Sequence, residues 1–195
     1  MDTITAGITL FLIMDPIGNI PVFLSILKDV SPARRRRVIA REMVFAYLVL
    51  LGMLFLGPEF LRLLQLRPEA ISIASGVILF IIALRMIFPT KGGVMGEEAE
   101  SEPFFVPLAV PLVAGPSTMA ILLLLVQQQP HRLFDWFLAL SGAWLAAVLI
   151  LLAAGVAFRV LKRRGLIALE RLMGMLLVAL AVQMLLDGIE KALGV

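Results

Sequence analysis

The chain contains no cysteine and only one histidine in 195 residues. The missing thiols exclude disulfide bonds, thiolate nucleophiles and cysteine metal sites. A metal centre built from several imidazoles is excluded as well, because His131 is the single histidine.

Charged residues are also scarce. They make up 16% of the chain, whereas 61% of the residues are hydrophobic and the mean hydropathy is +1.03. Ordinary soluble domains are roughly 45–50% apolar. Too few polar side chains remain to cover a soluble globule of this size. The composition therefore predicts an integral membrane protein, with the lipid bilayer as its first partner.

Long apolar runs set the expected number of membrane crossings. A helix needs roughly 20 apolar residues to cross the hydrocarbon core, and six runs approach or exceed this length. We expect an all-α protein with spans at Ile4–Leu27, Val38–Leu56, Ala70–Phe88, Phe104–Val126, Leu133–Phe158 and about Leu166–Leu186. The N-terminal MDTIT lacks the basic residues of a signal peptide, so we expect the first run to remain as a mature span.

Basic residues lie in blocks between these runs, which is typical of orientation signals rather than of a nucleic-acid surface. Of the 17 Lys and Arg residues, twelve fall in or beside the first, third and fifth loops, and four fall on the opposite side. The positive-inside rule then predicts cytoplasmic arginine-rich loops, a cytoplasmic loop 91–102, and both termini outside. We predict one membrane domain and no nucleic-acid partner.

Two of the spans carry helix-breaking residues. The first span contains DPIGNIP at 15–21, and the fourth contains VPLVAGPSTMA at 110–120. Proline removes a backbone donor and clashes with the preceding helical turn, and the backbone groups that it frees cannot face lipid. We therefore expect helices 1 and 4 to be broken, with the freed groups bonded to protein, water or a ligand.

The chain also resembles itself at a shift of 98 residues. SGVILFIIALRM (75–86) then lies on MGMLLVALAVQM (173–184) with four identities, and the two breaks are about 100 residues apart. If each half holds three spans, the second half (about 103–195) is inverted relative to the first (about 1–90). Inverted repeats with broken helices are typical of secondary transporters, whose site lies near the bilayer midplane.

The candidate site residues lie in the two breaks. Asp15, the only carboxylate that we place deep within a span, either caps a half-helix that begins at Pro16, or lines a polar cavity and holds a proton or cation. The hydroxyls of the second break either bond to carbonyls of their own helix or face the first break across the repeat axis. The expected substrate-binding set is Asp15, Pro16, Gly18, Asn19, Gly115, Pro116, Ser117 and Thr118.

Three stretches resemble the MarC family of bacterial inner-membrane proteins, also called UPF0056-type proteins: LIMDPIGNIPVFLSILK (12–28), VPLAVPLVAGPST (106–118) and LERLMGMLLVALAVQMLLDGI (169–189). The resemblance extends over nearly the whole chain and implies a multi-pass protein of the inner membrane. The family is grouped with LysE-like exporters, and some relatives are regarded as neutral amino acid transporters. Many relatives have glycine at the position of Ser117, so the substrate or its fit is expected to differ here.

The leading hypothesis is a secondary transporter of a small polar solute, for which the resemblance implies a neutral amino acid. No cofactor is expected. A coupling proton or sodium ion and a homo-oligomeric state are left open. A non-transporting scaffold or channel component is the alternative. An intramembrane enzyme is not expected, because Asp15 and Asp187 are the only candidate carboxylate pair, and we place Asp187, with Gln183 one turn before it, near the outer membrane edge.

Overall fold

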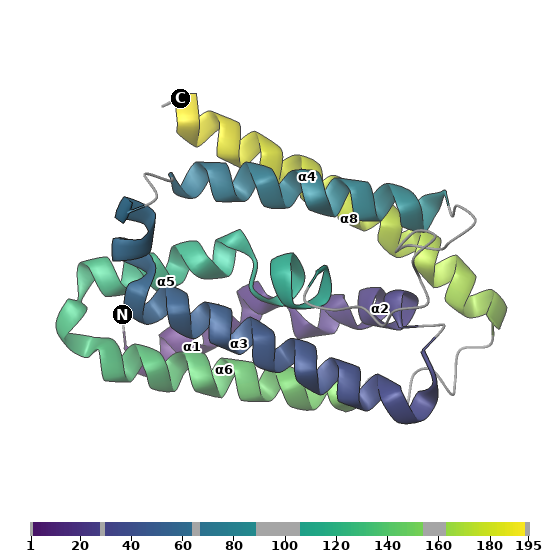
Figure 1. Cartoon of the computed structure of the whole chain (residues 1–195), viewed down its shortest axis with the longest axis horizontal. Helices are drawn as coiled ribbons and strands as arrows, with labels where there is room; N and C mark the ends of the chain where they lie inside the picture. The colour runs from purple at the N-terminus through teal and green to yellow at the C-terminus, as the bar shows by residue number, and fades with distance from the viewer. Residues whose placement is uncertain (1, 28–29, 64–66, 89–105, 154–162, 194–195) are drawn as a thin grey trace.

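The computed structural model describes residues 2–27, 30–63, 67–88, 106–153 and 163–193 (Figure 1). Its elements are α1 (Thr3–Met14), α2 (Pro16–Ile26), α3 (Pro32–Leu63), α4 (Pro68–Ile87), the π-helical turn η2 (Leu108–Val113), α5 (Pro116–Gln128), the 3-10 turn η3 (Pro130–Arg132), α6 (Leu133–Ala153) and α8 (Arg163–Leu193). Each of these elements is helical, as the sequence predicts.

Among the described residues, five segments are long and apolar enough to cross a membrane, which fits a multi-pass membrane protein. They match the first, second, third, fifth and sixth expected spans. Their bounds are Thr3–Ile26 (α1 with α2), Arg34–Glu59 in α3, Glu69–Ile87 in α4, Pro130–Ala153 (η3 with α6) and Arg171–Leu193 in α8. The last segment continues seven residues beyond the expected end at Leu186.

The fourth expected span differs from the other five. Its regular part, α5, has 13 residues, which rise only ~20 Å against the ~30 Å of a hydrocarbon core. Pro111 lies inside η2 and Pro116 opens α5, so proline divides this run into two short elements. The first residues of this span lie outside the described residues, as do the loop 91–102 and the end of the fifth span.

The helices form two groups (Figure 1). The long helices α4 and α8 run antiparallel and pack against each other along much of their length. In the second group, α1 packs on α6, α6 packs on α3, and α3 packs on α5. The short elements α2, η2 and α5 link the groups, because α2 contacts both α6 and α8 while α5 contacts both α3 and α4.

Small residues allow the close approach of α4 and α8. A Cβ atom on Gly76 would lie 3.0 Å from the carbonyl oxygen of Ala181, and a Cβ on Gly174 would lie 3.1 Å from the carbonyl oxygen of Ala83. In membranes, such small residues let two backbones gain van der Waals contact that larger side chains would prevent. The hydroxyl of Ser72 adds a hydrogen bond to a carbonyl of the facing helix, 3.1 Å long.

Polar and aromatic groups join α3 to α6. The indole Nε1 of Trp144 donates to the carbonyl oxygen of Met43 over 2.8 Å. The ring of Tyr47 stacks on Trp144 at a centroid distance of 4.5 Å, and its hydroxyl lies 2.7 Å from the hydroxyl of Ser141. These interhelical contacts fix the register of the two helices, because polar groups within the bilayer have few alternative partners.

Large apolar side chains also cover the outside of the helices. Leu12 on α1, Leu48 on α3, Leu145 on α6 and Leu180 on α8 are each more than half exposed. Contiguous apolar surface of this kind is rare on soluble monomers, and in a bilayer it is the surface that contacts lipid. The exposed faces and the apolar interior therefore agree with the membrane placement that the composition predicts.

Candidate functional site between two helix breaks

The first break is centred on Asp15, which both ends α1 and begins α2. Its backbone lies in the left-handed region, with φ 41° and ψ 60°, and its N–H donates to carbonyl oxygens of the last α1 turn. Its side-chain Oδ1 accepts a hydrogen bond from the N–H of Gly18 over 3.0 Å. Aspartate tolerates the left-handed conformation better than most residues do, and an acidic N-cap complements the positive end of α2.

The Asp15 carboxylate lies directly against the backbone of Gly18. A Cβ atom at position 18 would collide with the Asp15 carboxylate oxygen Oδ2. Only glycine at position 18 therefore allows the Asp15 carboxylate to lie this close to the backbone. Pro16 is buried at the first position of α2, where its missing N–H costs no helical hydrogen bond. Capping, one of the two roles that the sequence left open for Asp15, is thus the role described by these contacts.

Asn19 connects the first break to the second. Its side chain is 8% exposed, and Nδ2 donates to the carbonyl oxygen of Met14 over 2.9 Å and to that of Leu112 over 3.5 Å. Met14 is the last residue of α1, so its carbonyl has no partner within the helix. Leu112 lies in η2. One buried amide therefore bonds to backbone oxygens from both interrupted segments.

The second break is built from backbone alone. Val110 is extended within η2 (φ −129°, ψ 130°), and the N–H of Ala114 closes the turn on Ala109 over 2.8 Å. Gly115 then has φ −81° and ψ 163° and begins α5 without a side-chain cap. A Cβ at this position would lie 2.8 Å from the carbonyl oxygen of Pro111. Close packing, rather than an unusual φ, therefore requires the glycine.

The two breaks differ in charge at their helix N-termini. At α2 the first-turn N–H groups face the Asp15 carboxylate. At α5, the first-turn N–H groups have no side-chain cap at Gly115, and Pro116 contributes no donor. The arrangement sets a negative side chain at one helix start and a positive helix end at the other. Such a pair suits a ligand that carries both a cationic and an anionic group.

The predicted site residues fall into three exposure classes. Asp15, Gly18 and Ser117 are exposed, and Gly115 is half-buried. The others are buried: Pro16, Asn19, Pro116 and Thr118, the last with 2% of its surface exposed. The described contacts bring Asn19 to the second break, whereas the described hydrogen bond of Asp15 stays within its own break. Asp15 and Asn19 thus have different roles.

A model of the MarC family, described as integral membrane proteins, matches residues 2–193. The chain belongs to the MarC family. The UPF0056 inner membrane protein YhgN of Escherichia coli K12 is 49% identical over 190 residues, which cover 97% of this chain and 96% of YhgN. No solved structure matches.

More distant MarC-family relatives also align along almost their full length. A UPF0056 membrane protein of Buchnera aphidicola (Schizaphis graminum) is 48% identical over 97% of this chain and 96% of its own. One from Chlamydia pneumoniae is 32% identical over 95% and 92%. The resemblance drawn from the proline-glycine motifs is confirmed, and of these three relatives YhgN is named an inner membrane protein.

One buried acidic residue of this MarC-family protein was missed from the sequence. Glu42 in α3 is 0% exposed, and its Oε1 accepts hydrogen bonds from Arg41 Nε at 3.0 Å and Nη2 at 2.9 Å. In the sequence, Asp15 was singled out by its depth within a span, and Glu42 was given no role. The signal was present, because Glu42 lies one turn inside the expected span from Val38, but its basic neighbours made it resemble interfacial sequence.

Asp15 and Asp187, the carboxylate pair considered for an enzyme, each make hydrogen bonds to their own local partners. Asp187 on α8 accepts a hydrogen bond from Gln183 over 2.6 Å, as their spacing of four residues on one helix face predicts. Asp15 is engaged with the first turn of α2. In the described residues, therefore, each of these carboxylates bonds within its own helix region of the MarC-family fold.

Proposed function

We propose that this MarC-family protein is a secondary transporter that carries a small polar solute, such as a neutral amino acid, across the inner membrane. The solute binds between the break at Asp15 and the break at Gly115. The observation that carries the proposal is the hydrogen bond from Asn19 in α2 to Leu112 in η2, because it joins two interrupted membrane segments through buried polar groups. Irregular backbone within a membrane protein typically lines a site or a pathway.

The inverted repeat expected from the sequence is the second support for the proposal. A shift of 98 residues carries α2 onto α5, α3 onto α6, and α4 onto α8. The helix contacts occur in matching sets under this shift. Contact between α3 and α5 matches contact between α6 and α2, and contact between α2 and α8 matches contact between α5 and α4. A two-fold axis in the membrane plane would relate helices in this way.

Individual residues repeat the same relationship. The shift of 98 carries Gly76 onto Gly174 and Ala83 onto Ala181. The approach of Gly76 to the Ala181 carbonyl therefore has its counterpart in the approach of Gly174 to the Ala83 carbonyl. A Cβ added at each glycine would lie 3.0 and 3.1 Å, respectively, from the facing carbonyl oxygen. Antiparallel packing of α4 and α8 accounts for this pairing, because a helix pair that sets Gly76 against Ala181 also sets Ala83 against Gly174. The four identities in the sequence therefore remain the residue-level support for the repeat.

The charge pattern of the breaks supports a zwitterionic solute. An amino acid carboxylate would meet the N–H groups at the start of α5, where no side chain caps the helix. Its ammonium group would meet the carboxylate of Asp15, which uses one oxygen to accept from Gly18 and has further acceptor sites. The coupling ion, a proton or sodium, would act together with this site. The positive-inside count orients both termini to the periplasm.

Counterflow in proteoliposomes tests the function directly. Purified protein is reconstituted with internal unlabelled amino acid, and uptake of labelled neutral amino acids is followed. Saturable, substrate-specific counterflow by the wild-type protein is the expected result. Its absence for the whole panel of neutral amino acids and small polar metabolites would overturn the proposal and favour the scaffold or channel interpretation.

Two variants test whether transport depends on the proposed site. Asp15→Asn keeps an N-cap side chain that also tolerates the left-handed conformation, so it removes mainly the charge, and we expect it to abolish counterflow. Gly115→Leu should do the same, because its side chain meets the backbone of Pro111. The controls are Asp187→Asn and Gly52→Leu, since a Cβ on Gly52 would meet nothing within 4 Å. Equal loss in variants and controls would contradict this location.

A further inference from the structure

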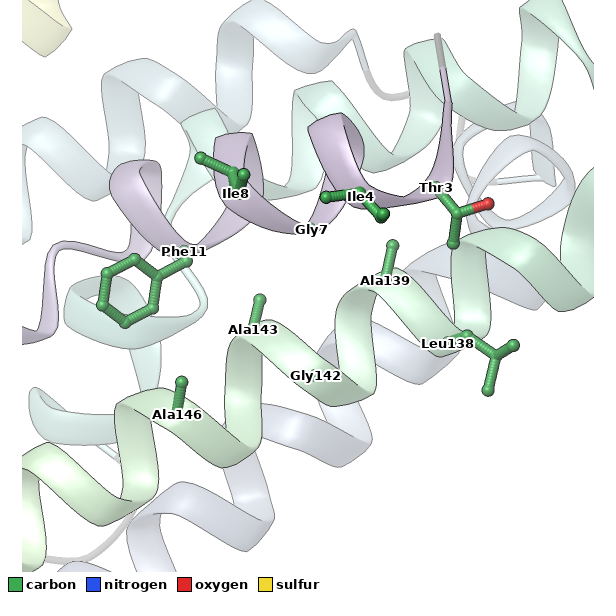
Figure 2. A pocket seen from close by; sticks show the side chains of 10 residues that line it. All are labelled: Thr3, Ile4, Gly7, Ile8, Phe11, Leu138, Ala139, Gly142, Ala143 and Ala146. Atoms are coloured by element: carbon green, nitrogen blue, oxygen red, sulfur yellow. The ribbon is translucent and has the colours of Figure 1, made fainter.

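A groove runs between α1 and α6 on the outside of the helix bundle (Figure 2). It has a volume of about 400 Å³, and hydrocarbon forms nearly all of its wall. From α1 it is lined by Thr3, Ile4, Gly7, Ile8 and Phe11, and from α6 by Leu138, Ala139, Gly142, Ala143 and Ala146. Thr3 is the one polar side chain among them, and it lies at one end of the groove.

The groove arises where α1 and α6 separate. The two helices run parallel and are closest where a Cβ on Gly7 would be 3.5 Å from the Ala139 carbonyl. From there the ribbons diverge, and the methyl groups of Ala143 and Ala146 point from α6 towards α1 without filling the space between them (Figure 2). A Cβ on Gly142 would meet nothing within 4 Å. The small side chains of α6 therefore leave the groove open.

We propose that this groove binds an acyl chain of a bilayer phospholipid. The surface around it faces lipid, because the side chains of Ile4, Ile8 and Leu138 are strongly exposed and apolar. The eight-residue rise from Thr3 to Phe11 measures ~12 Å, close to the ~15 Å of hydrocarbon in one leaflet. A parallel alkyl chain fits this length, and an empty groove would forgo the dispersion contacts of its lining atoms.

The polar end of the groove carries the chemistry that a phospholipid headgroup requires. Arg132 Nη2 donates to the hydroxyl of Thr3 over 3.2 Å, so a guanidinium lies at the mouth. The same guanidinium stacks 4.7 Å above the ring of Trp136 and pairs with Asp135 at 2.6 Å. Trp136 is fully buried, so its ring positions the guanidinium from within the bundle, and an arginine near the end of a span typically reaches the membrane–water interface. A phosphate beside Arg132 would leave its acyl chain directed along the groove.

Photolabelling with a defined lipid tests this site independently of transport. The full-length protein is reconstituted in vesicles that contain phosphatidylethanolamine with a diazirine in its acyl chain, and the labelled residues are located by mass spectrometry. We expect labelling of Ile8, Phe11 and Ala146 to exceed labelling of Leu176 and Leu180, which lie on the exposed face of α8. Equal labelling of the two regions would overturn the proposal.

A space-filling variant and its matched control sharpen the result. Gly142→Leu fills the groove and should reduce its labelling to the level of the α8 face, while Gly142→Ala should give an intermediate loss. Gly52→Leu adds the same side chain to another glycine with open space around it and should leave the labelling unchanged. Should Gly142→Leu fail to fold, the graded loss in Gly142→Ala still decides. Unchanged labelling in the folded Gly142 variants, or crosslinks between two copies through α1 and α6, would refute an acyl-chain site.

Discussion

The side-chain amide of Asn19 and the backbone carbonyl of Leu112 lie 3.5 Å apart, although 93 positions separate these residues in the chain. The same amide holds the carbonyl of Met14 at 2.9 Å. One buried side chain therefore satisfies the end of α1 and contacts the irregular turn that precedes α5. This contact makes the two breaks one region of the protein.

Replacing Asn19 with alanine should destabilise the protein by about 1–2 kcal/mol, because a buried carbonyl loses its hydrogen-bond donor. Thermal or denaturant unfolding in detergent micelles measures the loss. Gln183→Ala removes an exposed amide that bonds Asp187 and should cost less than about 0.5 kcal/mol. Equal costs for the two variants would show that the Asn19 contacts do not support the break.

Gly18→Ala should displace the Asp15 carboxylate from its capping position, because the added methyl group collides with that carboxylate. Loss of an N-cap costs about 1 kcal/mol, so the melting temperature should fall. The same substitution at Gly52 is the control, since open space surrounds that position, and helix propensity then favours alanine. A Gly18→Ala variant at least as stable as the Gly52→Ala protein would contradict the close approach.

The paired contacts of α4 and α8 predict equal sensitivity at two distant positions. Gly76→Val and Gly174→Val each press a larger side chain against the facing backbone, which costs about 1–3 kcal/mol in a packed interface. Because the proposed repeat relates these positions, we expect the unfolding free energies of the two variants to fall by similar amounts. The unfolding free energy of Gly142→Val, at a position with open space around it, should fall less. A large effect at one glycine and none at the other would argue against the two-fold relationship.

The carboxylate of Asp2 caps α1 and should titrate below its ordinary range. Its Oδ1 accepts the Thr5 N–H over 2.6 Å, and this hydrogen bond with the backbone of Thr5 lowers the pKa of Asp2. The cap therefore contributes stability above the unfolded-state pKa, and the contribution is lost as the pH falls through the lower folded-state value. Titration of a ¹³C-labelled Asp2 carboxyl measures the pKa, and an unshifted or raised value would show that the hydrogen bond does not form.

Part of the fold and the site followed directly from particular residues. The hydrophobic runs located the spans, and the breakers in DPIGNIP and AGPST located the interruptions, because hydropathy and the missing proline donor act locally. The identities at Gly76 and Gly174 also marked small positions. These patterns did not predict which hydrogen-bond partner each polar group has in the folded protein. Asn19 was expected in the substrate-binding set, but its acceptor at Leu112 is a backbone oxygen with no signature in the sequence.

Two other features depended on packing distances that no sequence pattern encodes. Glu42 is fully buried because α3 is packed there by its neighbours, not because its own segment is unusually apolar. The groove between α1 and α6 exists because these helices touch at Gly7 and then diverge. Runs of small residues are equally compatible with tight contact along the whole helix. The divergence is a property of the bundle.

The sequence by itself determined that this is a MarC-family membrane protein, where its apolar spans lie, and which residues interrupt them. These properties depend on transfer free energies and backbone chemistry that belong to each short segment. Only the tertiary structure decided which interruptions meet, through Asn19 and Leu112, and which helix start retains an uncapped positive end, at Gly115. Those outcomes depend on how helices far apart in the chain pack together, and packing is decided by the whole set of contacts at once.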